Sequence, residues 1–194
     1  MKKILFGLFA LSTLAFGAVG DNHLYLRAEF TPFAKYDISG DDEGAVKDRI
    51  SGASYGVEAE ITKEFMYGLE AGFGTGYQWQ GDFDYNASYD GDARLPDFNS
   101  IPVYFTVKYP LIPMGDLVPY IKGDIGYSFN DLDDNKYFSY ENGLYYGISV
   151  GADIQYLSLE ISYKVNEGKI KADGEKTDIE SSRVMFGAAY KFDF

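Results

Sequence analysis

The sequence predicts an all-β fold, an eight-stranded antiparallel up-and-down barrel that spans a membrane. Three observations support this. Eight runs of residues alternate between apolar and polar, as half-buried strands do. No lysine, arginine or carboxylate falls on the apolar side over the middle of any run, as a lipid-facing surface requires. The connections between runs alternate short and long, as they do in transmembrane barrels.

The first four runs are predicted as strands over 24–38, 50–62, 66–80 and 98–109. Apolar residues stand at every second position, as Tyr55, Val57 and Ala59 do in the second run. The positions between them hold mainly small residues and single charges, which suits the cramped inside of a narrow barrel. Pro32 and Pro102 lie within runs and each removes a ladder hydrogen bond, so we expect them at bulges or at the rim.

The last four runs are predicted as strands over 117–129, 144–155, 157–166 and 181–194. The final run carries Tyr190, Phe192 and Phe194 at alternate positions, and Phe194 is the last residue. Aromatic residues gather near both ends of the runs, the pattern of two interfacial girdles in a membrane barrel.

The predicted connections fall into two classes. The short ones are 63–65, 110–116 and 155–156, and the long, acidic ones lie near 39–49, 81–97, 130–142 and 167–178. In transmembrane barrels the short turns are periplasmic and the longer loops extracellular. Segments 82–93 and 131–142 partly match a calcium loop but fail at the turn and at the bidentate position. Solvated loops are the expected state, with weak divalent-ion contact as the alternative.

Residues 1–20 are predicted to be a signal peptide. Lys2 and Lys3 precede a short apolar run, and small residues follow, so cleavage is expected after about Gly17 or Gly20. The mature chain, 21–194, then forms one barrel domain of an exported protein. The formal charge of −13 argues against nucleic acid as a partner. The single histidine, His23, is expected to be an exposed residue just after the signal.

Charged residues on the polar side of the runs are predicted to face the lumen. The set comprises Arg27, Glu29, Glu58, Glu60, Glu70, Lys108, Lys122, Asp124, Asp153, Glu160, Lys164, Arg183 and Lys191. Charges in so narrow a space are tolerable only when paired or wet, and eight strands leave an interior just wide enough for side chains. We therefore expect a plugged, salt-bridged lumen with small water pockets. A symmetric hairpin would place Glu70 opposite Lys108, and a short turn near Phe65 would bring Glu60 beside Glu70.

The mature chain resembles the small eight-stranded outer-membrane barrels, the family of the transmembrane domain of outer membrane protein A and of OmpX-like proteins. The final strand carries the most specific likeness, because that family ends in Phe after alternate aromatic or apolar residues, as Tyr190, Phe192 and Phe194 do. The resemblance implies that this end is the signal read by the barrel-assembly machinery. Enzymes among the outer-membrane barrels need a histidine near the outer side, whereas His23 lies at the other end.

The sequence thus predicts no enzyme, no catalytic residue, no cofactor and no metal site. The expected role is in envelope structure and surface interaction, through acidic, Tyr-rich loops such as 136–146, for which a place in the upper aromatic girdle is the alternative. The rival function is a narrow or gated conduit for small solutes or ions. The expected location is the outer membrane of a Gram-negative-type bacterium. Expected partners of this monomer are outer-membrane lipid, lipopolysaccharide, the assembly machinery and a host or envelope ligand at the loops.

Overall fold

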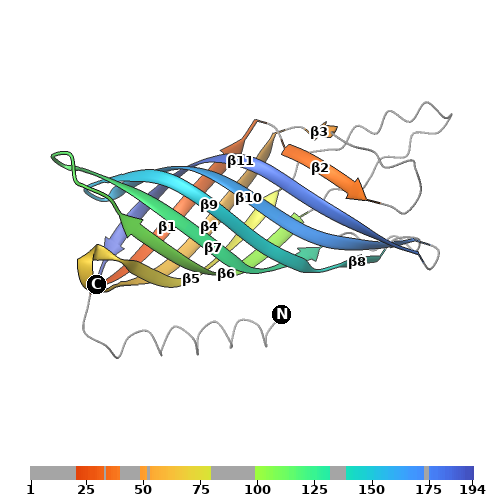
Figure 1. The fold of residues 1–194 in the computed structure, drawn as a ribbon, viewed down its shortest axis with the longest axis horizontal. Coiled ribbons are helices and arrows are strands. Elements are labelled where there is room, and N and C mark those ends of the chain that lie inside the picture. The colour runs from red at the N-terminus through yellow and green to blue at the C-terminus, as the bar shows by residue number, and fades with distance from the viewer. Residues whose placement is uncertain are drawn as a thin grey trace.

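The computed structural model describes residues 21–32, 34–39, 49–51, 53–79, 99–131, 139–172 and 175–194. They form an antiparallel β-barrel, and among them no helix is long and apolar enough to cross a membrane (Figure 1). A short 3-10 helix covers Met66–Gly68. The strands are β1 (Asn22–Thr31), β2 (Ala34–Ser39), β3 (Arg49–Ser51), β4 (Ser54–Glu64), β5 (Glu70–Trp79), β6 (Asn99–Pro110), β7 (Leu117–Asp131), β8 (Ser139–Glu141), β9 (Gly143–Ile154), β10 (Leu157–Ala172) and β11 (Glu175–Asp193).

The barrel closes where the first strand meets the last. β1 pairs antiparallel with β11, so that Leu26 is the partner of Tyr190, and each other strand of the wall pairs with its neighbour in sequence. The closed ring runs β1, β4, β5, β6, β7, β9, β10, β11 and back to β1. Three short strands lie outside this ring, at the end opposite the short turns. β2 pairs with β11 and with β3, and β8 pairs with β10. The eight-stranded antiparallel barrel predicted from the sequence is confirmed.

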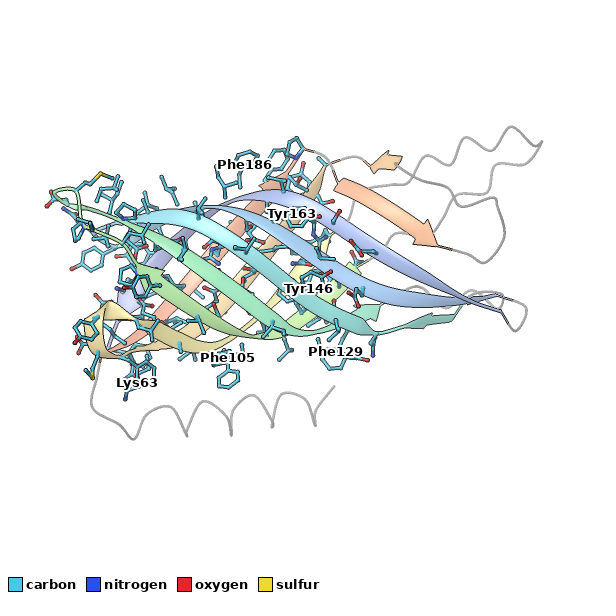
Figure 2. All side chains as sticks on the ribbon, in the orientation of Figure 1. Lys63, Phe105, Phe129, Tyr146, Tyr163 and Phe186 are labelled. Atoms are coloured by element: carbon cyan, nitrogen blue, oxygen red, sulfur yellow. The ribbon has the colours of Figure 1, made fainter. Side chains whose placement is uncertain are left out.

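Alternation along each strand separates an apolar outside from a polar inside. Ile125 and Ile148 are 62% and 64% exposed, whereas Asp124 and Ser149, each next in sequence to one of them, are 5% and 2% exposed. Figure 2 shows Phe105, Phe129 and Phe186 on the outer surface of the wall. So large an exposed apolar surface on a folded chain is typical of a face that meets lipid. The predicted inward and outward faces agree with the burial of the described side chains except at Val165, which was predicted on the apolar outer face but is 2% exposed.

The two prolines within strands interrupt the ladder in different ways. Between the pairs Phe30–Phe186 and Ala34–Arg183, the strand that contains Pro32 has one residue more than β11, so Pro32 lies at a β-bulge, as predicted. Around Pro102 the register of β5 and β6 is unchanged, but the pairing is interrupted between Thr75–Val103 and Gln78–Ser100. Proline has no N–H to donate to β5, which explains the interruption without a bulge.

Two of the short connections lie where they were predicted, between β6 and β7 and between β9 and β10, whereas the first, predicted at 63–65, lies between Glu64 and Glu70. The predicted strand 66–80 begins only at Glu70, because Tyr67 and Gly68 have φ angles of 65° and 74° and belong to a tight turn. This left-handed conformation is incompatible with an extended strand. The residues between β6 and β7 form a turn that projects from the end of the barrel at which the C-terminus lies. Gln155, with φ of 54°, makes the two-residue turn between β9 and β10.

The prediction of a long loop over 167–178 was wrong. β10 extends to Ala172 and β11 begins at Glu175, and the register between them is unbroken from Leu157–Tyr190 to Ala172–Glu175. This hairpin projects beyond the ring, and β8 pairs with its edge. The segment is rich in charged residues, and its sequence therefore resembles a loop. Asp173-Gly174 is a dipeptide typical of two-residue hairpin turns and is the signal that indicates the hairpin.

Most of the other three predicted long connections lies outside the described residues. Of 39–49, 81–97 and 130–142, the described parts are the ends of β2, β3 and β7, the whole of β8, and Asn142. The predicted signal peptide, 1–20, also falls outside the described part of the chain, as do all of 82–93 and residues 132–138 of the two segments that resemble a calcium loop.

Candidate functional site

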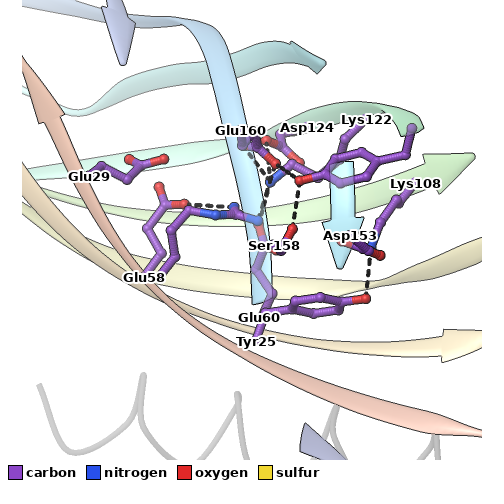
Figure 3. A network of polar contacts seen from close by, with 12 residues as sticks. Tyr25, Glu29, Glu58, Glu60, Lys108, Lys122, Asp124, Asp153, Ser158 and Glu160 are labelled. Carbon is purple, nitrogen blue, oxygen red and sulfur yellow. Dashed lines mark hydrogen bonds and ion pairs between the residues drawn. The ribbon is translucent and has the colours of Figure 1, made fainter. Parts of the chain in front are cut away.

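The thirteen charged residues expected in the lumen all lie on inward-facing positions of the ring. Eleven are at most 5% exposed, and Asp153 and Lys191 are half-buried toward the end with the short turns. The structure joins twelve of them in two clusters of ion pairs, and Arg183, outside both clusters, donates a hydrogen bond to Gln78. Figure 3 shows part of the two charged clusters from close by, with Glu58, Glu60 and Glu160 of one and Lys108 and Asp153 of the other.

The central cluster consists of Arg27, Glu29, Glu58, Glu60, Lys122, Asp124, Glu160 and Lys164. Arg27, on β1, uses Nη1 to reach Glu60 at 3.0 Å and Glu58 at 3.4 Å, and Nη2 to reach Glu160 at 3.2 Å. Because Glu58 and Glu60 belong to β4 and Glu160 to β10, one guanidinium connects three strands of the wall. A fork of donors on a planar group suits this role better than a single ammonium would.

Two lysines complete the central cluster from the other side of the lumen. Lys122 Nζ, from β7, lies 2.8 Å from Glu60, 3.2 Å from Glu160 and 3.7 Å from Asp124. Lys164 Nζ, from β10, lies 2.6 Å from both Glu29 and Glu58. Tyr104 donates a hydrogen bond of 2.9 Å to Glu60. The contacts therefore cross the lumen at mid-height rather than merely joining adjacent strands.

The lower cluster, nearer the short turns, consists of Glu70, Lys108, Asp153 and Lys191. Lys108 Nζ lies 2.5 Å from Asp153 and 3.6 Å from Glu70, and it donates a hydrogen bond of 2.8 Å to the hydroxyl of Tyr25. The ammonium also stands over the rings of Tyr25 and Tyr120, at 4.5 and 4.4 Å from their centroids. Lys191 is 4.0 Å from Glu70. A cation held by carboxylates and ring faces together is strongly fixed in position.

The register prediction around Glu70 was right on one side and wrong on the other. Glu70 is the direct cross-strand partner of Lys108, as predicted. Glu60 is not beside Glu70, because the turn is centred two residues later than predicted and sets Gly74 opposite Glu60 and Glu70 opposite Glu64. Asp153 takes the place expected for Glu60 as the second carboxylate at Lys108.

Arg183 lies above the charged clusters in a group of neutral side chains. It donates a hydrogen bond to Gln78, whose Oε1 also accepts one of 2.9 Å from Ser100. Asn166 contacts Gln78 and Ser100 at 3.3 and 3.2 Å. Arg183 is 2% exposed, and the structure does not bring it into ion-pair distance of any of the seven predicted lumen carboxylates.

Four inward tyrosines are part of the site that charge patterning alone did not reveal. Tyr25, Tyr104, Tyr120 and Tyr145 are at most 2% exposed. Three of them face glycine on a neighbouring strand: Tyr104 is the partner of Gly74 and Gly126, Tyr120 of Gly151, and Tyr145 of Gly126, whereas Tyr25 is the partner of Glu60 and Lys191. A Cβ added to Gly74 would lie 2.5 Å from the ring of Tyr104. Large residues on one strand and glycines at the paired positions of the next are the sequence signal for them.

Two predictions about individual residues were wrong. His23 is 3% exposed rather than exposed, and its Nδ1 lies 2.7 Å from Asp193 and its Nε2 3.4 Å from Glu64, where the first and last strands meet. Tyr145, in the Tyr-rich segment 136–146, is fully buried against Tyr104 at a ring distance of 5.1 Å, so it serves neither as adhesive surface nor in a girdle.

The C-terminal aromatics lie on the outer face at the closure of the barrel. Tyr190, Phe192 and Phe194 are 49%, 43% and 59% exposed. The backbone of Phe194 exchanges hydrogen bonds of 3.0 and 3.3 Å with that of Asn22. The last residue thus joins the two ends of the described chain while its ring faces outward.

Comparisons with known proteins agree with this architecture. The curated protein PM1543 of Pasteurella multocida, itself described as uncharacterized, is 25% identical over 235 aligned residues, which cover 99% of this chain and 98% of that protein. Two solved structures share the fold. Outer membrane protein OprG of Pseudomonas aeruginosa has a TM-score of 0.55 at 17% identity, over 90% of this chain and 96% of that one. Neisserial surface protein A has a TM-score of 0.52 at 12% identity, over 87% and 97%.

A family model supplies the assignment. The model described as the outer membrane protein beta-barrel domain matches residues 4–192, which is nearly the whole chain. The closed eight-stranded ring, its apolar outer face and its charged lumen are the features expected of such a domain. The chain therefore belongs to the outer membrane protein beta-barrel domain family and is located in the outer membrane of a Gram-negative bacterium.

Proposed function

We propose that this chain is a non-enzymatic barrel whose lumen is closed by the central cluster, and that it acts in envelope structure and in surface interaction through its long connections. One observation carries the proposal. Lys122 on β7 bonds to Glu60 on β4 and to Glu160 on β10, and Arg27 on β1 bonds to the same two carboxylates. These four residues come from four separate parts of the ring and meet at its centre.

The packing around this centre supports a closed cross-section. The charged groups of the central cluster are buried, and Tyr104 and Tyr145 fill the space beside them. An eight-stranded ring is only just wide enough for its own side chains. A charged side chain held in several ion pairs does not move aside on its own, because its displacement leaves buried partners without a compensating charge.

The surface role rests on the other parts of the molecule. The wall is anchored in lipid by its apolar face, so the parts that meet the outside are the connections at the end opposite the short turns. Segments 40–48, 80–98 and 132–138 are acidic, and 80–98 and 132–138 also carry aromatic residues, which suit interfaces. We further expect the chain to be a monomer, to contact lipopolysaccharide, and to be recognised by the barrel-assembly machinery through Tyr190, Phe192 and Phe194.

Osmotic swelling of liposomes that contain the refolded chain tests the closed lumen. Liposomes with this protein should swell in small sugars or amino acids no faster than empty liposomes, whereas a porin control should swell rapidly. Swelling above the empty control would favour the rival function, a conduit for small solutes or ions, which the polar lining of the lumen would permit if the cluster opened.

Capture on intact cells tests the surface role. Cells that display the wild-type chain should retain a host or envelope component more strongly than cells whose segment 132–138 is replaced by a Gly-Ser linker of equal length. The two cell types must carry equal amounts of barrel in the outer membrane. Equal retention for this and for matching replacements of 40–48 and 80–98 would contradict a role of the connections in binding.

A further inference from the structure

One wall of the lumen holds a group of buried oxygen atoms that have no hydrogen-bond partner in the structure. They are Thr106 Oγ1, Asp124 Oδ1 and Oδ2, Tyr145 Oη, Ser149 Oγ and Ser162 Oγ. All five residues are at most 5% exposed. Buried polar atoms are nearly always paired, so a group of unpaired ones in a single region points to a bound species. We call these five residues the oxygen cluster.

The strand register brings the oxygen cluster together. Thr106 on β6 is the cross-strand partner of Asp124 on β7, and Asp124 is the partner of Gly147 on β9. Tyr145 and Ser149 lie two residues to either side of Gly147, on the same inward face, and Ser149 is the partner of Ser162 on β10. Inward positions related in this way lie within reach of one another.

A glycine leaves room beside the carboxylate. A Cβ added to Gly147 would be 3.8 Å from Asp124 Oδ2, so the carboxylate points toward the stretch of β9 that has no side chain. Tyr145 and Ser149 flank that stretch along β9. The same Cβ would lie 3.3 Å from Lys164 Cγ, so the stem of Lys164 borders the space next to Asp124 together with these polar residues.

The charge balance of the central cluster indicates the sign of the bound species. The cluster joins three cations, Arg27, Lys122 and Lys164, to the five carboxylates already named, which leaves two surplus negative charges when all are ionised. Asp124 shares Lys122 with Glu60 and Glu160, which are closer to its ammonium. Water alone would pair the hydroxyls but would leave this surplus buried, which is unfavourable.

We infer that the oxygen cluster binds a small monovalent cation, such as Na⁺ or K⁺, with Asp124 as the charged ligand and the hydroxyls of Tyr145, Ser149 and Thr106 as neutral ones. Hard cations take oxygen ligands of this kind. Because Lys122 lies 3.7 Å from the same carboxylate, binding is weak and needs a high cation concentration. This inference does not depend on whether the lumen conducts.

Urea unfolding of the refolded full chain in lipid vesicles tests the site. Stability is compared in KCl, in NaCl and in N-methyl-D-glucamine chloride at equal ionic strength, because the organic cation is too large to enter. A cation at ten times its dissociation constant should lower the unfolding equilibrium constant roughly elevenfold. Asp124→Asn, which keeps the shape but removes the charge, should abolish the difference between salts. Asp153→Asn, the same change in the lower cluster, should preserve it.

Anomalous scattering from crystals grown in RbCl locates the cation directly. A rubidium peak beside Asp124 and Ser149 in the wild type, lost in Asp124→Asn, is the expected result. Equal stability in all three salts together with water alone at the site would overturn the inference, and would mean that protons neutralise the surplus charge. A rubidium peak elsewhere in the lumen would overturn it as well. If Asp124→Asn failed to fold, Ser149→Ala would serve in both measurements and should weaken the effect.

Discussion

Lys108 on β6 and Asp153 on β9 form an ion pair of 2.5 Å across the strand that separates them, β7. The pair is possible because the lumen is narrow and because Gly151, on the same face of β9, makes room for the ring of Tyr120, over which the ammonium of Lys108 stands. Lys108 is therefore held from two sides, by Asp153 and by its direct partner Glu70.

Replacing Lys108 with methionine should destabilise the barrel by about 3–5 kcal/mol, because two largely buried carboxylates lose their shared cation. Adding Asp153→Asn should recover more of the loss than adding Glu70→Gln, because Glu70 keeps hydrogen bonds from Tyr25 and Thr62. Urea unfolding in lipid vesicles of the single and double variants measures both effects. Strictly additive costs for Lys108→Met and Asp153→Asn would show that the two residues do not interact.

Replacing Ile148 with lysine should cost about 2–4 kcal/mol, the usual range for lysine at the mid-plane of a lipid-facing strand. Ile148 is 64% exposed on the outer face of β9. Ile148→Ala controls for the loss of the side chain itself and should cost much less. Folding titrations into vesicles give both values, and a cost for the lysine variant no larger than that of the alanine variant would place Ile148 outside the lipid.

Two glycines on β7 should respond in opposite ways to alanine. A Cβ at Gly126 would overlap the carbonyl oxygen of Val103 and lie 2.5 Å from the Cα of Tyr104, whereas a Cβ at Gly123 meets nothing within 4 Å. Gly126→Ala should destabilise the barrel by about 1–3 kcal/mol or prevent closure, as overpacking does. Gly123→Ala should be neutral. Heat-modifiable migration on cold gels reports folding of each, and equal behaviour would refute the close packing of Tyr104 against β7.

Phe194→Ala should reduce the amount of barrel in the outer membrane far more than it reduces export. The backbone contacts between Phe194 and Asn22 survive this substitution, so the loss would be due to the aromatic ring. Phe194→Tyr should restore assembly. Quantification of the outer-membrane and periplasmic fractions distinguishes the two steps, and normal levels of Phe194→Ala in the outer membrane would argue against an assembly signal at the terminus.

The fold could be predicted because long strands that alternate apolar and polar residues form a closed barrel when their apolar face must meet lipid. The positions of Ile148 and Ser149, the closure by the last strand and the pairing of Glu70 with Lys108 all follow from that pattern. The hairpin over 167–178 was missed because the segment is rich in charged residues and its strands extend beyond the ring.

The site was predicted in its composition but not in its connections. Parity along each strand places Arg27 and Lys122 inside, but the partners of a long side chain depend on contacts across the lumen, which sequence spacing does not specify. Because the turn around Tyr67 is centred two residues later than predicted, Glu60 pairs with Lys122 and Arg27 rather than lying near Lys108. The buried position of His23 likewise depends on the closure that brings Asp193 to it.

The measurement that tests the closed lumen most directly is single-channel recording of the refolded full chain in a planar bilayer. With Arg27 and Lys122 both bonded to Glu60 and Glu160 at the centre of the ring, we expect no steady large conductance over prolonged recording. Long-lived open levels comparable to those of a porin would contradict the account and would make transport the function of the barrel.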